Sequence, residues 1–543
     1  MVAMRFDGMF GERPGRHPQR LSLQEGQVAR NIRITSQSAE PFWGRAKERD
    51  VDMGVSPRTL FRDRNGLWLE FSDYVHVCNT IIGNDAHDRV FFVGPGTTPR
   101  VSDGARRTSG TGPYPGASIR LGVPVLENPP TLTIIDSGDD EDEDGALNEE
   151  QSRSYLVTLV NAFGEEGPPS PAAGPVSVFP GGVVEIGLPG APGGDYELDK
   201  YYIYRFTDGA WQYIGEAGIA ATTFTDNDTT VSQEPLESED WQEPPDNLES
   251  MIVIGGAFLA GHRSNEVLFS EFQLPHAWPL QYRQSVDYTV RAIGSFGATL
   301  VVLTNGPVYM AQGTTPAAMA VTETNINYSC SSAESVVSMN SAVVYASPDG
   351  LVRIGQDGQN GLVTGAVFTE REWRDLNPET IRATHWRDIY IATYDGNNGS
   401  GAFMFDPLTP DAGVIFLDLP RLSALYNFID EDRLFMVDEG ELEILEWDAD
   451  DTTLFAPFLW RSRPVDMPKP SAVNVVRVFA DSYPATLRLF ADGEQQAETT
   501  VVDDRPTRVH GGHLARTYEL EIESEHRTYS IMAATSIAEL REV

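Results

Sequence analysis

The sequence predicts an all-β protein of several domains, with a β-propeller as the largest. Glycine (49) and proline (36) are frequent throughout the 543 residues. Short β-branched and aromatic runs end at Asp-Gly or Asn-Gly pairs, whereas long runs with a 3.6-residue period are scarce. The length exceeds what one hydrophobic core serves, and 41% apolar residues are enough to build several cores. A strand–turn–strand unit also recurs at nearly constant spacing.

The repeated unit is a hairpin with two apolar strands around a tight turn. Its four copies occupy residues 298–310, 341–354, 388–405 and 432–444, with turn glycines at Gly306, Gly350, Gly396 and Gly440. These glycines are 44, 46 and 44 residues apart. Asn-Gly and Asp-Gly turns are typical of hairpins. A hairpin with this period predicts four-stranded propeller blades, which we place at residues 249–450.

Two further hairpins, at residues 88–96 and 257–269, precede the repeat and raise the number to six. Gly96 and Asn265 are 169 residues apart, far more than one period. The simplest account is a domain inserted between blades. We therefore expect the first propeller strands at residues 59–124 and the insert at residues 125–248.

The insert carries its own strand signals. Tyr155–Val160 runs into a Gly/Pro turn, Lys200–Phe206 and Trp211–Gly215 form a hairpin, and Thr222–Asp226 closes the domain. These strands resemble a fibronectin type III or related β-sandwich. After Asp451, apolar and polar residues alternate well, which predicts a C-terminal β-sandwich at residues 451–543 with one wet face.

The net charge is −40, from 40 Lys+Arg against 80 Asp+Glu. A surface this acidic repels nucleic acid and anionic membranes, so it excludes general affinity for either. The first 64 residues differ, with 12 basic and 8 acidic residues. We expect residues 1–58 to form an N-terminal arm and docking segment.

Targeting and redox signals are sparse. Residues 1–20 lack the apolar region of a secretory signal, and the longest apolar stretch, 251–261, is too short and glycine-rich to span a bilayer. The sequence thus predicts no membrane segment. Cys78 and Cys330 are too few for a disulfide framework, which favours synthesis in a reducing cytoplasm.

Motifs for catalysis or cofactor binding are weak. Asp140, Asp142, Asp144 and Gly145 match the first positions of a calcium loop, but Gln151 stands where a bidentate glutamate belongs. A solvated acidic loop is the alternative, and the sequence does not decide whether the Asp140–Asp144 loop binds calcium. Phosphate-loop, nucleophile-elbow and His-Glu-x-x-His motifs are absent from the sequence. We predict a non-enzyme with no catalytic, metal or cofactor site.

The order of parts resembles the nozzle proteins of short-tailed bacteriophages, the tail tubular protein B family. The segments that carry the resemblance are Phe10–Pro14, Ala29–Ile34, Ala39–Phe42, Thr59–Arg62, Trp68–Phe71, Asp88–Phe92, Tyr155–Gly167 and Phe458–Ser462. The resemblance covers nearly the whole chain, and the order of the segments rather than any one motif supports it. Gln37-Ser38 departs from the glycine-leucine turn of the family.

The resemblance implies a structural virion protein, made in the host cytoplasm and placed in the virion tail. Six copies would form a ring below the portal and adaptor, joined to tail fibres or spikes. The ring would retain the genome and then release it through an acidic channel, which the genomic DNA would pass through without specific binding. The basic arm would dock on the head-to-tail adaptor, with candidate residues Arg13, Arg16, Arg20, Arg30 and Arg33.

Two other functions fit the same composition. A tail-associated glycan-binding or depolymerising propeller predicts an acidic pair or an aromatic platform at the propeller centre. A cellular propeller scaffold predicts a monomer that binds protein partners.

Overall fold

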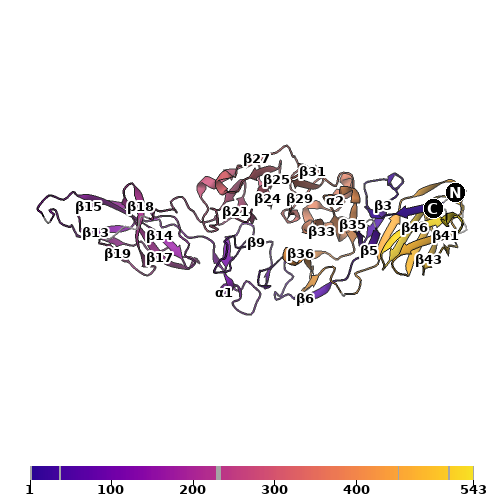
Figure 1. Ribbon diagram of the computed structural model, residues 1–543, viewed down its shortest axis with the longest axis horizontal. Coiled ribbons are helices and arrows are strands. Elements are labelled where there is room, and N and C mark those ends of the chain that lie inside the picture. Colours follow the sequence, from indigo (N-terminus) through magenta and orange to yellow (C-terminus); the bar gives the residue numbers. More distant parts are fainter. Residues whose placement is uncertain are drawn as a thin grey trace.

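The computed structural model describes residues 3–35, 38–142, 144–227, 234–450, 452–510 and 514–541. The molecule is elongated, and its three parts follow one another along the long axis (Figure 1). The inserted sandwich forms one end, the propeller the middle, and a second sandwich the other end, where both chain termini lie. The strand pairing confirms the predicted all-β class with a propeller and two sandwiches.

Six four-stranded units form the propeller blades. The first blade holds β9 (His76–Asn79), β10 (Val90–Val93), β11 (Arg100–Ser102) and β12 (Ile119–Arg120), and the second holds β20 (Ser250–Ile254), β21 (Phe258–Arg263), β22 (Glu266–Phe269) and β23 (Gln284–Ser285). The third holds β24 (Val290–Phe296), β25 (Thr299–Thr304), β26 (Tyr309–Gln312) and β27 (Thr322–Glu323), and the fourth holds β28 (Val337–Ser338), β29 (Ala342–Ser347), β30 (Gly350–Gly355) and β31 (Gly361–Leu362). The fifth holds β32 (Arg382–Trp386), β33 (Ile389–Gly396), β34 (Gly399–Phe405) and β35 (Val414–Leu417), and the sixth holds β36 (Leu422–Phe428), β37 (Arg433–Asp438), β38 (Glu443–Glu446) and β6 (Ala46–Asp50).

The six predicted hairpins are the second and third strands of these blades. Such strands are covered on both faces, so β29 and β30 are buried at every residue and read as continuous apolar runs. The turn glycines serve different needs. Gly440 adopts a φ of +87°, whereas a Cβ on Gly396 would lie 2.5 Å from the carbonyl oxygen of Asp375.

A two-stranded hairpin, β7 (Thr59–Arg62) and β8 (Trp68–Phe71), lies between the sixth and first blades. The Trp68 ring packs edge-on against Phe435 of the sixth blade, with ring centres 4.8 Å apart. On the other side Phe71 contacts Phe92 of the first blade at 5.3 Å. The hairpin therefore completes the ring as a partial seventh unit.

The insert is a sandwich of seven strands, the number found in immunoglobulin-like domains. One sheet contains β13 (Thr131–Asp136), β16 (Val183–Gly187) and β19 (Thr223–Asp226). The other contains β15 (Ala173–Val178), β14 (Gln151–Asn161), β17 (Leu198–Thr207) and β18 (Ala210–Gly218).

The terminal sandwich combines strands from both ends of the chain. One sheet contains β1 (Ala3–Asp7), β4 (Ile32–Thr35), β5 (Ser38–Pro41), β41 (Val475–Ala480), β44 (Thr507–Arg508) and β46 (Thr528–Ala534). The facing sheet contains β2 (Phe10–Glu12), β3 (Glu25–Arg30), β39 (Phe458–Ser462), β40 (Val465–Ser471), β42 (Ala485–Ala491), β43 (Glu494–Val501) and β45 (Ala515–Ser524). Their shared core holds Phe6 from the first strand against Trp460, with ring centres 5.8 Å apart.

The expectation of a separate N-terminal arm at residues 1–58 is wrong. Strand β1 pairs along its whole length with β46, and β6 closes the sixth blade by pairing with β38. Between them, β2 and β3 join β35 of the fifth blade to β39 of the sandwich, which produces one eleven-stranded sheet. Charge counting missed this because most of these basic side chains pair with acidic residues far along the chain.

The α-helices of the described residues are short, α1 (Gly104–Arg107) and α2 (Glu370–Asp375). None of the helices in the described ranges is long and apolar enough to cross a membrane.

Candidate functional site

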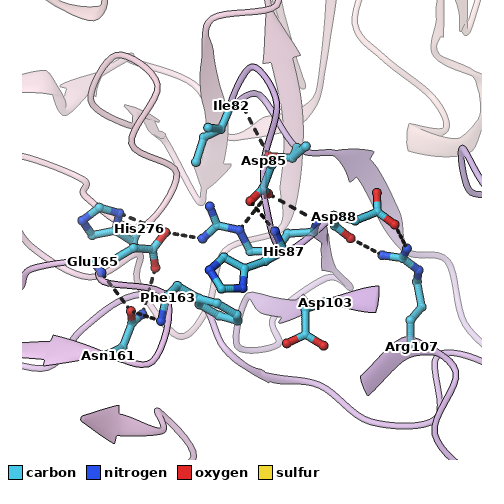
Figure 2. Close-up of polar contacts among 12 residues, drawn as sticks. Ile82, Asp85, His87, Asp88, Asp103, Arg107, Asn161, Phe163, Glu165 and His276 are labelled. Carbon is cyan, nitrogen blue, oxygen red and sulfur yellow. Dashed lines mark hydrogen bonds and ion pairs between the residues drawn. The ribbon is translucent and has the colours of Figure 1, made fainter. Parts of the chain in front are cut away.

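The insert is fixed to the propeller by a buried ionic cluster (Figure 2). Arg89, next to the start of β10, is only 4% exposed and lies between two carboxylates. Its Nε is 2.8 Å from Asp85 Oδ2 in the same blade, and its Nη1 is 2.6 Å from Glu165 Oε1 in the turn after β14. His276, which follows the second blade's β22, places Nδ1 3.3 Å from the same Glu165 oxygen. One carboxylate of the insert is thus held by both neighbouring blades.

Phe163 lies beside this cluster and extends it with aromatic contacts. The guanidinium of Arg89 is 4.9 Å from the Phe163 ring centre, and that of Arg106 is 5.5 Å from it. His87 meets the same ring nearly edge-on at 5.0 Å. Cation–π contacts of this kind gain strength when water is excluded. Ion pairs and aromatic contacts therefore both hold the turn after β14 against the propeller.

A second buried arginine continues the network away from the insert. Arg107 of α1 is 1% exposed, and its Nε lies 2.8 Å from Asp63 Oδ2 of the β7–β8 hairpin. It also pairs with Asp88, which neighbours Arg89 in the chain (Figure 2). Ion pairs therefore link the insert, the first blade and the partial seventh unit.

Glu165 remains ionised in this setting. Burial alone would raise its pKa, but the His276 and Arg89 charges and a hydrogen bond from Asn161 outweigh burial and lower the pKa of Glu165 to about 2. The Asn161 amide donates to Glu165 Oε2 at 2.8 Å. The contact between the insert and the propeller around Arg89, Glu165 and His276, called the joint below, therefore depends on a charged carboxylate that is shielded from solvent.

Contacts at the propeller centre cross the ring. Arg58, at the start of β7, pairs with Glu334 of the short 3₁₀ helix that precedes the fourth blade. Arg382 of the fifth blade approaches the same carboxylate at 3.4 Å. Tyr74, before the first blade, donates to the Ala333 carbonyl oxygen at 3.4 Å. These contacts join segments on different sides of the ring, and an open pocket of about 770 Å³ lies beside them.

Two of the predicted docking arginines have structural roles. Arg13 is 3% exposed, with Nε 2.7 Å from Glu25 and Nη2 3.0 Å from Asp411. Its prediction as a docking residue is wrong, because burial leaves it no surface for a partner. Arg33 pairs with Asp448 and stacks on the Phe42 ring at 5.1 Å, so it fastens β4 to the end of the sixth blade.

The other three candidates lie on the surface. Arg16 pairs with Glu25 at 3.3 Å, and Arg30 pairs with Asp418 at 3.4 Å while remaining about half exposed. Arg20 is exposed at the end of a short 3₁₀ helix. The Arg30–Asp418 pair is exposed and contributes little to stability, whereas the Glu25 partner of Arg16 is buried.

The acidic loop organises itself by hydrogen bonds. Asp142 Oδ1 accepts the backbone N–H groups of Asp144 and Ala146, at 3.0 and 2.8 Å. Asp140 and Asp144 are exposed, and Glu143 lies outside the described residues. Among the residues that the structure describes, no group of three or more His, Cys, Asp or Glu side chains is arranged to hold a metal ion.

Both segments of the joint stand out in the sequence, but nothing in the sequence predicts that they contact each other. Asp88–Phe92 and Phe163–Glu166 were both singled out as family patterns. The signal that could have joined them is an arginine before a strand and two adjacent glutamates in a turn. With 80 acidic residues, such a signal selects no particular pair.

No family model and no curated protein matches this chain. Solved structures that match include Hsv2 of Kluyvelomyces marxianus (10% identity, 50% of this chain, 70% of that chain, TM-score 0.27). Others are BBS1N in complex with ARL6DN (10%, 75% and 98%, TM-score 0.30) and the Pan2 WD40 domain of Neurospora crassa (9%, 51% and 86%, TM-score 0.28). These TM-scores are below 0.5, so the propeller assignment rests on the strand pairing.

Proposed function

We propose that this chain is a structural subunit of a short bacteriophage tail, in which six copies surround the path of the genome below the adaptor. The observation that carries the proposal is the continuous eleven-stranded sheet. This sheet joins the fifth blade to the terminal sandwich through β2 and β3. A wall subunit that resists DNA pressure needs domains that do not hinge, and a shared sheet supplies backbone hydrogen bonds across the boundary.

The propeller centre supports a path between subunits rather than through one. Arg58, next to β7 of the partial seventh unit, pairs with Glu334 before the fourth blade, so a contact spans the interior of the ring. A ring of subunits would enclose DNA at its own six-fold axis. The net charge of −40 per chain would repel phosphates there and keep the genome from adhering.

The alternative glycan-binding or depolymerising propeller receives less support. It predicts an acidic pair or an aromatic platform at the propeller centre. The pocket there contains Asp73 and Glu334 together with the rings of Phe71, Tyr74 and Phe92, but Glu334 is paired with Arg58 and Arg382. A catalytic dyad needs carboxyl groups whose protonation can change during the reaction.

Electron microscopy and native mass spectrometry of the purified full chain test the proposal. We expect six-fold rings, alone or after addition of a head-to-tail adaptor protein. A monomer under every condition, or a ring of another order, would contradict the proposed assembly. Replacing Arg16, Arg20 and Arg30 together by glutamine should weaken adaptor binding, and the melting temperature measured in parallel shows how much of the loss comes from the pairs with Glu25 and Asp418.

A further inference from the structure

An open pocket of about 690 Å³ lies beside the joint, between the insert and the propeller. Its walls come from the β17–β18 hairpin, the turn after β14, the linker around Trp241, and the segment from Leu274 to His276. Ligand sites occur preferentially at such domain boundaries. This pocket has no part in the proposed tail function, and its argument is independent of that function.

One wall of the pocket is aromatic. Tyr202 and Tyr204 are two residues apart on β17, so their side chains share a face. Tyr213 of β18 pairs with Tyr204 in the sheet register, and its ring centre lies 5.2 Å from that of Tyr202 and 5.9 Å from that of Tyr204. Opposite them, Trp241 meets the His276 ring edge-on at 5.5 Å. The pocket thus offers several ring faces to a ligand.

The polar groups of the pocket are mainly hydrogen-bond acceptors. Glu166 is partly buried and accepts hydrogen bonds from the hydroxyls of Thr158 and Tyr204, at 2.7 and 2.8 Å. Glu234 and Glu237 add exposed carboxylates at the rim.

The cationic group near Glu166 is His276, whose charge opposes the effect of burial on the pKa of Glu166. Within the described ranges no lysine or arginine forms an ion pair with Glu166, and burial raises its pKa. Arg89, the one arginine that lines the pocket, is already held by Asp85 and Glu165. A partly buried carboxylate that no lysine or arginine pairs with is unfavourable, and a bound guanidinium would relieve it.

We propose that this pocket binds the guanidinium group of an arginine side chain from a partner protein. A guanidinium donates hydrogen bonds without accepting any, which matches the excess of carboxylate oxygens. Its flat face stacks on tyrosine rings, which a compact ammonium does less well. A neutral sugar would need donors from the protein, and two of the donors here, the Arg89 guanidinium and the Tyr204 hydroxyl, already donate to Glu165 and Glu166.

Titration of the full chain with acetyl-arginine amide, followed by saturation-transfer NMR, tests the proposal. We expect saturable binding, with acetyl-citrulline amide, its neutral counterpart, binding at least about tenfold more weakly. Nα-acetyl-lysine amide, which keeps its side-chain ammonium group, should bind with an affinity between those of the other two probes. Equal binding of the arginine and citrulline probes, or preference for a neutral saccharide, would overturn the assignment.

Variants locate the binding. Glu166→Gln and Tyr213→Leu should each weaken acetyl-arginine amide binding about tenfold. Glu237→Gln changes an exposed rim residue that folding does not need, and it should weaken binding about threefold even if the buried variants misfold. Tyr529→Leu, an exposed tyrosine on the terminal sandwich, is the matched control and should bind like the parent chain. Unchanged affinity in both Glu237→Gln and a folded Glu166→Gln would place the ligand elsewhere.

Discussion

Arg89 Nη1 and Glu165 Oε1 lie 2.6 Å apart, although the residues are 76 positions apart in the chain and belong to different domains. Both side chains are nearly excluded from solvent, at 4% and 9% exposure. The stability of a buried ion pair across a domain boundary depends strongly on both partners, because removal of one leaves the other as an unpaired charge shielded from solvent. This pair therefore helps to set where the insert sits on the propeller.

Arg89→Ala should destabilise the joint by about 3–5 kcal/mol, because Glu165 and Asp85 would keep buried charges without their cation. Urea unfolding followed by tryptophan fluorescence, together with protease sensitivity of the insert, measures the effect. Lys200→Ala removes an exposed pair with Glu216, 2.8 Å long, and is the control. We expect it to cost less than about 1 kcal/mol. Equal effects of the two variants would mean that the joint is not held by its ion pair.

Acid should loosen the same joint. The pKa of Glu165 is about 2 in the folded chain, below the ordinary value of 4.5, so its contribution is complete above pH 4.5 and is lost as the pH falls toward 2. The loss amounts to about 3 kcal/mol. Other carboxylates also titrate in this window, so the informative quantity is the difference in unfolding free energy between the parent and Glu165→Gln. That difference should shrink as the pH falls, and a constant difference would contradict the assignment.

Glu12 should show the opposite dependence on pH. Burial raises its pKa to about 7, despite a hydrogen bond from the Ala29 backbone N–H at 3.2 Å. A carboxyl with a raised pKa favours the fold at low pH, and this advantage is lost as the pH rises from 4.5 through 7. Glu12→Gln, which can still accept the Ala29 hydrogen bond, should be about 3 kcal/mol more stable than the parent at pH 8 and equal to it at pH 4. Thermal or urea unfolding at the two pH values measures this, and a stabilisation independent of pH would exclude ionisation as its cause.

Gly11 should tolerate no side chain. It lies in β2, where a Cβ would approach the carbonyl oxygens of Ala412 and Val414 to 2.7 Å. Gly11→Ala should therefore push β2 away from β35 and destabilise the chain by about 1–3 kcal/mol. Gly54→Ala meets no atom within 4 Å and serves as the control, expected within about 0.5 kcal/mol of the parent. Hydrogen exchange at β2 and β35 would show whether the pairing between these two strands is lost. Protection equal to that of the parent would contradict the prediction that a side chain at Gly11 separates them.

Local signals predicted the propeller well. The apolar run at 341–347 and the turn at Asp349-Gly350 lie close together in the chain, so pattern and turn chemistry alone predicted β29 and β30. Local signals do not predict the whole of the sixth blade. Its fourth strand is β6, and nothing local in residues 46–50 marks them as the partner of residues 443–446.

The prediction of Arg13 as a docking residue is wrong for the same reason. Arg13 and Arg20 look alike in the sequence, both basic and both near proline or glycine. Arg13 is buried and pairs both with the nearby Glu25 and with Asp411, nearly 400 residues later. Burial depends on which distant segment covers a side chain, and a charge count carries no such information.

By itself the sequence determined the all-β class, the hairpins and their period, because strand propensity, alternation and turn glycines act over a few residues. Tertiary structure alone decided which strands close each sheet, which of many carboxylates meets Arg89, and that the N-terminal strands join the propeller to the terminal sandwich. These are contacts between segments distant in sequence. Their partners are chosen by shape and by the burial of charge, which no local pattern records.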